Sequence, residues 1–273
     1  MTSIDTKKQL NQEFQEVKYI LTSTMRTKLL ISLYEDSKNL EQLRIDLNKP
    51  SATILHGLKE LENKNLISKF QKYYQLTSNG YLLTTNMLKL IDNWYSINRN
   101  KIFWNNHDLS GIPNESIKQI YLLKDCEYVK STTSDLSNAF NNYTKLLKTA
   151  ENIKIILPIY SENHFKHIIK LLTKGKVKTL ELIITNDIMT SIKKKSKFEK
   201  SLLNNEKVKI KIINEPLNLF LTTSESFMSL TLFFKDGHYD DSQILIGKTE
   251  NSIIWGQHIH RLYGKRSGDV NET

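Results

Sequence analysis

Cysteine is almost absent from this sequence: Cys126 is the one cysteine among 273 residues. It has no second thiol to pair with, so a fold held by internal disulfides is excluded. Long apolar runs are also absent. The richest run, residues 153–160, has the length of a strand and contains Pro158, whereas a membrane helix needs roughly 18 apolar residues. The polar start MTSIDTKKQL leads into no apolar segment of signal-peptide type. We expect a cytoplasmic protein without membrane association.

The glycine motifs of many enzymes are missing as well. Gly-x-x-x-x-Gly-Lys-Ser/Thr, Gly-x-Gly-x-x-Gly and Gly-x-Ser-x-Gly do not occur, so nucleotide cradles and nucleophile elbows are not expected. His164 and Lys166 match the His-x-Lys of phospholipase D-type phosphodiesterases. That chemistry also needs an orienting acid, and the position five residues after the lysine is Leu171. We therefore interpret this triplet as part of a solvated helix face.

Metal binding is another use to consider for the histidines. Two pairs stand out, His164 with His167 and His258 with His260, and only the first, at i and i+3, shares one helix face. No cysteine or tight carboxylate cluster accompanies either pair, as a zinc site would require. The sequence therefore predicts no metal, no cofactor and no enzyme activity.

What the sequence does contain is typical of a globular protein with two domains. Hydrophobic residues make up 39% and charged residues 25%, and a length of 273 residues favours two cores of unequal size. The net charge of +10 points to a polyanionic partner. Residues 1–80 carry 12 Lys/Arg against 9 Asp/Glu, a net of +3, which leaves +7 for the rest. The net charge of the whole chain is therefore only weak support for nucleic-acid binding. The local arrangement of residues must carry that argument.

Apolar periodicity predicts several helices in the first 64 residues. They are Lys7–Leu21, Thr24–Tyr34, Leu40–Leu47 and Ser51–Lys64. The first has an apolar stripe that we expect to pack on the residues that follow, namely Leu10, Phe14, Val17 and Leu21. Ser23 or Thr24 can cap the second helix, Pro50 ends the third, and Ser51 can cap the fourth. Two short helices joined by a tight turn predict a helix-turn-helix.

The fourth helix has a polar outer face, opposite an inner face of Ile54, Leu55, Leu58 and Leu61. Residues 66–80 follow as two strands around a turn at Gln71–Lys72, which completes a winged helix-turn-helix over residues 1–80. We predict double-stranded DNA as its partner. The helix residues expected to reach base edges are Ser51, Thr53, His56 and Lys59, and the wing residues expected near phosphate are Lys69, Gln71 and Lys72.

The elements of this region follow one another as a helix, a short helix, a helix that contains LKELENKNLI (58–67), and then YYQLTSNGY (73–81). The whole pattern resembles the ArsR-like archaeal winged-helix regulators, in which a Leu-Thr-x-x-Gly step ends the wing. This resemblance implies a DNA-binding transcriptional regulator.

Residues 81–100 are predicted to form a linking helix that makes a homodimer. Its apolar residues follow spacings of four, three, four and three, namely Leu83, Met87, Leu90, Trp94 and Ile97. Such a heptad seam is typical of a dimer helix, and helix-turn-helix proteins usually read two half-sites. The alternative is a helix that packs on its own domain.

Residues 101–273 are predicted to form an α/β domain. No periodicity is visible at 103–113, where we place the boundary. Strand-like and helix-like runs then alternate at 126–129, 135–149, 153–158, 163–172, 180–185, 187–194, 198–203 and 208–213. This alternation predicts parallel strands, whereas the later strands at 217–222, 227–234 and 243–246 suggest antiparallel additions before a last helix at 250–265. The overall class is α+β, with a mixed, partly parallel sheet in the second domain.

Several segments of this domain form a recognisable set. They are FWNNHDLSGIP (103–113), STTSD (131–135), LPIY (157–160), SLTLFFKDGHYD (229–240) and WGQHIHRLYGKRS (255–267). The set resembles the regulatory domain of the methanogenesis regulatory proteins of Fil type. The resemblance implies a regulator whose second domain senses a signal, without defining a ligand.

Ligands of open α/β sheets lie beyond the carboxyl ends of the parallel strands, and polar residues follow those ends here. The candidate effector-binding residues are Thr132, Thr133, Tyr160, Thr185 and Asn186. The alternative is that these residues merely cap the helices that follow. We predict a dimeric transcriptional regulator modulated by a small effector. The rivals are a small-molecule enzyme and a protein-interaction module, each carrying a winged-helix domain.

Overall fold

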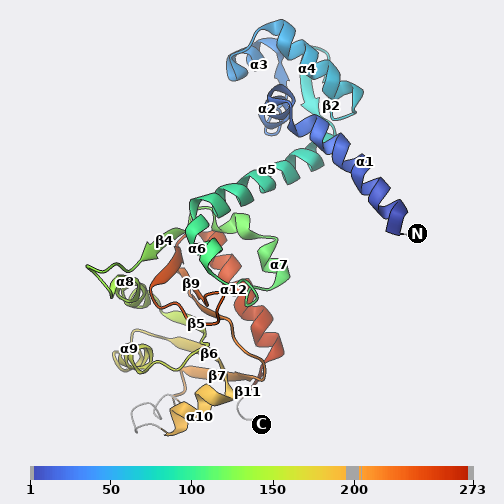
Figure 1. Cartoon of the computed structure of the whole chain (residues 1–273). Helices are drawn as coiled ribbons and strands as arrows, with labels where there is room; N and C mark the ends of the chain where they lie inside the picture. The colour runs from blue at the N-terminus through green and yellow to red at the C-terminus, as the bar shows by residue number, and fades with distance from the viewer. Residues whose placement is uncertain (1–2, 195–202, 204, 270–273) are drawn as a thin grey trace. The chain divides into compact units, whose positions relative to one another are not determined.

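The computed structural model describes residues 3–194, 203 and 205–269. The chain forms two compact units, residues 1–91 and 92–273, and helix α5 (Ser78–Arg99) contains the boundary between them (Figure 1). Along the parts of the chain that the structure describes, no helix is long and apolar enough to cross a membrane.

The first unit is a helical core with a small sheet. Its elements before α5 are α1 (Ser3–Leu21), α2 (Thr24–Ser32), β1 (Lys38–Asn39), α3 (Leu40–Leu47), α4 (Ser51–Asn63), β2 (Ile67–Phe70) and β3 (Tyr73–Leu76). The strands pair in the order β1-β3-β2, all antiparallel. The predicted helices and the hairpin around Gln71 and Lys72 are confirmed as elements.

Local hydrogen bonds fix where the short helices begin. The Ser23 side chain accepts from the Arg26 amide, as predicted, and Asn39 forms a reciprocal capping box with Gln42 at the start of α3. The prediction that Ser51 caps α4 was wrong. Pro50 occupies the N-cap position with extended backbone (φ −60°, ψ 146°), so Ser51 is already helical and the helix has no side-chain cap.

The buried face of α4 is rotated slightly from the predicted one. Ile54, Leu58 and Leu61 are buried, whereas Leu55 is 42% exposed, contrary to expectation. Gly57 explains the difference, because a Cβ there would lie 2.8 Å from Leu29 Cδ1 of α2. Gly57 therefore lies directly against α2, so the face centred on it is buried and Leu55 lies outside that face.

The stripe on α1 is not covered within its unit, so the expectation that it packs on the following residues was wrong. Exposed fractions there are 70% for Leu10, 58% for Phe14, 41% for Val17 and 40% for Leu21. Periodicity reveals that a helix has an apolar face but not which surface covers it. Ile20, by contrast, joins the core of the unit.

The Leu-Thr-x-x-Gly step joins the hairpin to α5. The Thr77 amide donates to Leu66 O and its hydroxyl donates to Asn65 O, while the Gly80 amide donates back to Thr77 Oγ1 at 3.1 Å. A Cβ on Gly80 would lie 1.8 Å from the Leu66 carbonyl oxygen. Only glycine fits where the helix start crosses the chain entering β2.

The second unit is built on one eight-stranded sheet. After α5 the elements are α6 (Lys101–Asn106), α7 (Asn114–Ile117), a 3-10 helix (Ile120–Leu123), β4 (Glu127–Lys130), α8 (Asn138–Leu147), β5 (Asn152–Ile156), α9 (Glu162–Thr173), β6 (Thr179–Thr185), α10 (Asn186–Lys194), β7 (Val208–Ile213), β8 (Leu219–Thr223), β9 (Met228–Leu232), β10 (Gln243–Gly247), α12 (Glu250–Arg266) and β11 (Gly268–Asp269). The order is β11-β7-β6-β5-β8-β9-β10-β4. The predicted helix at 198–203 lies outside the described residues, apart from Leu203.

Among the described strands, β5, β6 and β7 alone pair in parallel, and the other pairings in the sheet are antiparallel. The predicted mixed sheet is present. However, β4, which we expected in the parallel set, is an edge strand paired with β10. The segment 103–113, expected to be irregular, begins within α6, where Phe103 and Trp104 are buried. The burial of these two rings in the core stabilises a helix here, although the sequence shows no helical periodicity.

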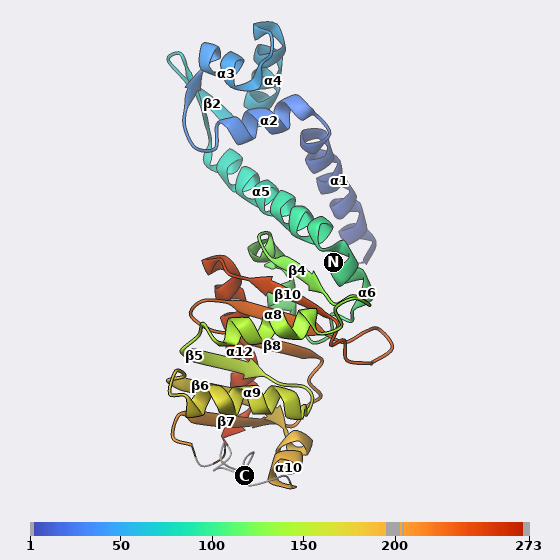
Figure 2. The same ribbon diagram turned by 90° about the vertical axis from the view of Figure 1, so that its left-hand side faces the viewer.

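Helices cover both faces of the sheet. Figure 2 shows α8 and α9 in front of the strands, with α12 behind them. Each face has its own apolar cluster, one containing Tyr143 and Phe165 from α8 and α9, the other containing Trp255 and Ile259 from α12.

Three of the sequence segments that resemble Fil-type proteins, residues 103–113, 229–240 and 255–267, contribute to the apolar cluster on the α12 side of the sheet. His107 is 1% exposed; its Nε2 lies 2.9 Å from Asp240 Oδ2, and the Asp108 amide donates to Phe233 O. From α12, Trp255 Nε1 donates to Ser116 O at 2.9 Å, and the Tyr263 hydroxyl donates to Gly111 O at 2.7 Å. These hydrogen bonds hold residues 103–116 against the sheet and against α12. The residues that form them therefore have a structural role.

Candidate nucleic-acid interface and effector cleft

The polar face of α4 is open to solvent. Thr53, His56 and Lys59 are exposed and Ser51 is half-buried, while the opposite face packs against α2. These four residues therefore share the outer surface of one helix. A helix surface of this kind can reach base edges in a major groove.

The lysine and arginine side chains of this unit differ in whether a carboxylate already neutralises their charge. Arg44 pairs with Glu41 at 2.7 Å and Lys38 pairs with Asp46 at 2.6 Å. Among the residues that the structure describes, Lys59, Lys69 and Lys72 have no carboxylate within ion-pair distance. The cations of α4 and the hairpin thus remain available to phosphate.

The hairpin presents these cations at its tip. Gln71 has φ 53°, a left-handed conformation that closes the turn. Lys72 Nζ lies 5.9 Å from the ring centre of Tyr73, and Lys69 Nζ lies 5.2 Å from that of Tyr74. The aromatic rings orient the lysine stems while the ammonium groups stay exposed.

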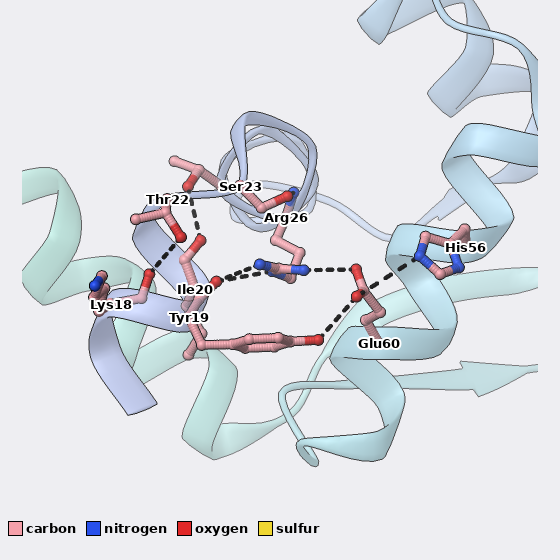
Figure 3. A network of polar contacts seen from close by, with 9 residues as sticks. Lys18, Tyr19, Ile20, Thr22, Ser23, Arg26, His56 and Glu60 are labelled. Atoms are coloured by element: carbon pink, nitrogen blue, oxygen red, sulfur yellow. Dashed lines mark hydrogen bonds and ion pairs between the residues drawn. The ribbon is translucent and has the colours of Figure 1, made fainter. Parts of the chain in front are cut away.

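A partly buried network holds α4 against α1 and α2 (Figure 3). Arg26 Nη1 donates to Glu60 Oε2 at 2.8 Å, and its Nε donates to the Tyr19 carbonyl at 3.1 Å. The guanidinium also lies over the Tyr19 ring, whose hydroxyl donates to Glu60 at 2.9 Å. His56 Nε2 lies 3.7 Å from Glu60 Oε1. The Arg26 hydrogen bond is the main reason that the pKa of Glu60 lies below its usual value.

The sequence reading missed Lys49 and the start of α4. Lys49 is exposed, directly precedes Pro50, and has no ion-pair partner among the described residues. With Pro50 as N-cap, the first backbone amides of α4 have no side-chain acceptor. An uncapped helix start beside a lysine favours a phosphate group. A cation in the turn between the two short helices was the available signal in the sequence.

The five predicted seam residues of α5 have different environments. Met87 is 4% exposed and belongs to the core of the first unit, and Leu83 packs partly against that core. Leu90, Trp94 and Ile97 are exposed by 57%, 65% and 39%. Of the five predicted seam residues, the three on the second half of α5 are therefore the ones left uncovered.

Three of the five predicted effector residues line one cavity of about 630 Å³. Tyr160, Thr185 and Asn186 lie there with Asn214 and Glu215, at the carboxyl ends of the parallel strands. Asn186 Nδ2 donates to Asn214 Oδ1 at 3.0 Å across two strand ends. We refer to this cavity as the strand-end cleft.

Thr132 and Thr133 are not among the lining residues of the strand-end cleft. The end of β4 points to the same edge of the sheet as the end of β5, but β8, β9 and β10 lie between the two strands. Thr132 Oγ1 instead accepts from the Asp135 amide at 3.2 Å in a local turn. Thr132 therefore closes a turn ahead of α8, whose N-cap residue is Ser137, and this hydrogen bond does not cap the helix.

His164 lines a different cavity, of about 230 Å³, between α8, α9 and the sheet. Burial is the main cause that lowers the pKa of His164 to about 4, and His167 contributes further. Lys166, two residues on, pairs with Glu162 at 2.5 Å, and Leu171 is buried. Within the described residues, no group of three His, Cys, Asp or Glu side chains is placed to hold a metal ion.

Comparison with known proteins gives two family matches in chain order. Residues 14–94 match the N-terminal domain, and residues 136–266 the middle domain, of the methanogenesis regulatory protein FilR1. The curated FilR1 of Methanothrix harundinacea (strain 6Ac) is 27% identical over 263 residues, which cover 94% of this chain. The chain spans 58% of the length of that relative.

Solved structures resemble the chain more distantly. TrmBL2, an archaeal chromatin protein, gives a TM-score of 0.41 at 14% identity, covering 90% of this chain and 93% of that chain. The dimethyltransferase RosA of Streptomyces davawensis gives a TM-score of 0.27 at 13% identity, covering 78% of this chain and 67% of that one. Likenesses at this level carry no functional argument.

Proposed function

We propose, from its homology to the methanogenesis regulatory protein FilR1, that this chain is a dimeric, sequence-specific DNA-binding transcriptional regulator. In this proposal α3, α4 and the β2–β3 hairpin form an ArsR-like winged helix-turn-helix. The observation that supports it best is the set of exposed, unpaired cations on α4 and the hairpin, next to a polar helix face.

Side-chain chemistry and position separate the residues proposed to contact bases from those proposed to contact phosphates. Ser51, Thr53, His56 and Lys59 read base edges from the major groove, because they share the outer face of α4. Lys69, Gln71 and Lys72 contact phosphates through the wing and set the position of the domain on the duplex. The network around Arg26 keeps α4 in a fixed orientation, as base readout requires.

The test compares three variants of the full chain in binding to its own promoter DNA. Lys72→Ala removes one phosphate contact, so affinity falls for all sequences and the slope of log K against log salt decreases by about 1. His56→Ala changes the preference among operator variants, by about 1–3 kcal/mol at the contacted base pair. Lys145→Ala removes the same charge from exposed α8 of the other unit and is the matched control. If Lys72→Ala and His56→Ala both bind as the control does, the assignment of this face is wrong.

Dimerisation is proposed to use the second half of α5. Leu90, Trp94 and Ile97 recur at spacings of four and three, and all three are exposed in the single chain. Covering them in a two-fold seam removes apolar surface from water. Leu83 and Met87 then support the helix from within the first unit and do not form part of the seam.

The second unit is proposed to sense a small effector in the strand-end cleft. Tyr160, Thr185 and Asn186 contribute one ring, one hydroxyl and one amide to its lining. The start of α10 also opens at this cleft, since α10 begins at Asn186. A ligand bound there would tie the ends of β5, β6 and β7 together.

A further inference from the structure

A second large cavity, of about 470 Å³, lies on the face of the sheet that α12 covers, opposite the face covered by α8 and α9 (Figure 2). Its walls come from the strands β5, β6 and β7 and from α12, all within the second unit. It shares no lining residue with the strand-end cleft. We call it the α12 cavity.

Sheet register explains why charged side chains gather there. Lys154 of β5 is directly opposite Glu181 of β6, and Lys211 of β7 lies two positions beyond the partner of Glu181. Because side chains two residues apart share a face, all three project to the α12 side of the sheet. The central strands of a covered sheet rarely carry charges, so this placement needs an explanation.

The cavity has a strong excess of positive charge. Its lining contains four permanent cations and one carboxylate, a net of +3, with the cations Lys154, Lys211, Arg261 and Lys265. Glu181 lies 3.6 Å from Lys211 and neutralises one of them. In the described part of the chain, no carboxylate lies within ion-pair distance of Lys154, Arg261 or Lys265. Cations of like charge held together without carboxylates repel one another until an anion enters.

A buried imidazole accompanies these cations. His260 is 3% exposed, and its Nε2 has no hydrogen-bond partner within the described structure. Burial lowers the pKa of His260 to about 4, with Lys154 and Lys211 lowering it further against the opposing effect of Glu181. The ring is therefore neutral at pH 7. Buried polar atoms in folded proteins nearly always have a partner, so an unpaired one in a cavity wall indicates a missing polar group.

We propose that the α12 cavity binds a small aliphatic polyanion, of the class of phosphorylated or polycarboxylate metabolites. The three cations without a carboxylate partner among the described residues supply donors that such an anion needs, as do the amide side chains of Gln119 and Gln257. Arg261 also lies 2.8 Å from His258 Nδ1 through its Nη2. Among the described residues that line the cavity, the imidazoles of His258 and His260 are the only aromatic rings, which argues against a nucleotide base. The site would be a second input to the proposed regulator, yet its existence does not depend on DNA binding.

A small anion fits this cavity better than a nucleic acid does. Lys211 is only partly exposed and His260 is buried, so a duplex backbone could not reach them without opening the α12 face. A ligand of a few atoms can enter a concave site of this volume and contact several donors at once. The +7 net charge of residues 81–273 also finds a partial explanation here.

The test titrates the full chain with inorganic pyrophosphate and, separately, with citrate in a calorimeter. Both Lys154→Gln and Lys265→Gln change exposed side chains and so leave the fold intact. We expect one site for at least one probe, with Kd raised tenfold or more in each variant. Lys145→Gln removes the same charge from α8, on the other face of the sheet, and should leave Kd unchanged.

Three outcomes would overturn the proposal. The first is that neither probe binds the wild-type chain. The second is that Lys145→Gln weakens binding as much as Lys154→Gln, which would show a general charge effect. The third is that Lys154→Gln weakens DNA binding in the absence of any small anion, which would assign this face to nucleic acid. Failure of the DNA-binding proposal alone would leave the calorimetric result unchanged.

Discussion

Replacing Arg26 by methionine tests the network that holds α4 in place. Methionine keeps much of the length of the side chain but removes the hydrogen bonds to Glu60 and to the Tyr19 carbonyl. The side chains of Arg26 and Glu60 are 11% and 23% exposed, so the pair lies between a fully buried and a surface ion pair. Breaking a buried pair costs about 3–5 kcal/mol and an exposed one about 0–1 kcal/mol. We therefore expect Arg26→Met to lower the free energy of unfolding of the first unit by about 2 kcal/mol, between these two ranges.

The matched control is Arg44→Met. Arg44 pairs with Glu41 at 2.7 Å, nearly the same distance as Arg26 to Glu60, but the two side chains are 46% and 66% exposed. Solvent screening reduces the value of such a pair, so this control should cost no more than about 0.5 kcal/mol. The comparison separates burial from ion-pair geometry.

Hydrogen–deuterium exchange of the full chain in increasing urea is the suitable assay. All three tryptophans lie in the second unit, so fluorescence does not report on this network. Peptides from α2 and α4 give the opening free energy of the first unit directly. A double-mutant cycle with Glu60→Gln then isolates the coupling of the pair. If Arg26→Met costs no more than Arg44→Met, the reasoning from burial is refuted.

The same pair has a pH signature. Glu60 has a pKa below its usual value of 4.5 in the folded chain, so its contribution is complete above pH 4.5. It is lost as the pH falls below 4.5 through the lowered folded pKa. The stability difference between wild type and Arg26→Met should therefore shrink in acid, and a constant difference would contradict the assignment.

Three further predictions concern α5 and the second unit. Leu90→Glu places a charge in the proposed seam at an exposed position, so we expect a folded monomer with poor operator affinity; light scattering that shows an intact dimer would contradict this. Tyr160→Ala should lose the thermal stabilisation that wild type gains from the effector in cell-extract metabolites, and equal stabilisation of both proteins would place the site elsewhere. His164 and His260 have folded pKa values of about 4, below the usual 6.5, because both rings are buried. Their neutral forms therefore favour the fold, and this contribution is complete above pH 6.5. The free energy of unfolding should fall between pH 6.5 and pH 4, by up to about 1.4 kcal/mol per pH unit for each histidine. Urea unfolding followed by tryptophan fluorescence should show this loss, and equal midpoints at pH 7 and pH 5 would rule it out.

The sequence by itself determined most helices and strands, because their apolar periods and caps are local. Leu40–Leu47 was predicted with its exact bounds, since Asn39 caps one end and Asn48-Lys-Pro50 closes the other. The hairpin turn at Gln71 followed from two short β-like runs. The sequence also predicted the exposed polar face of α4, because the apolar residues of this helix mark the opposite, buried face.

Packing partners could not be read from periodicity. The stripe of α1 and the seam of α5 have the same kind of spacing as any buried helix, yet Leu10 and Leu90 are exposed while Met87 belongs to the core. Which apolar residue is covered depends on a second surface, and that surface lies far away in the sequence or in another molecule. The same limit hid the approach of α2 to Gly57, which left Leu55 outside the buried face of α4.

Strand order decided which polar residues meet. The sequence shows that Thr132 and Tyr160 each follow a strand, but only the sheet topology places β8, β9 and β10 between β4 and β5. Pairing between strands is set by contacts across the whole domain, so adjacency along the chain is no guide to adjacency in the sheet. For the same reason the sequence could not predict the α12 cavity. Lys154, Lys211 and His260 belong to three different elements, which come together only in the folded domain.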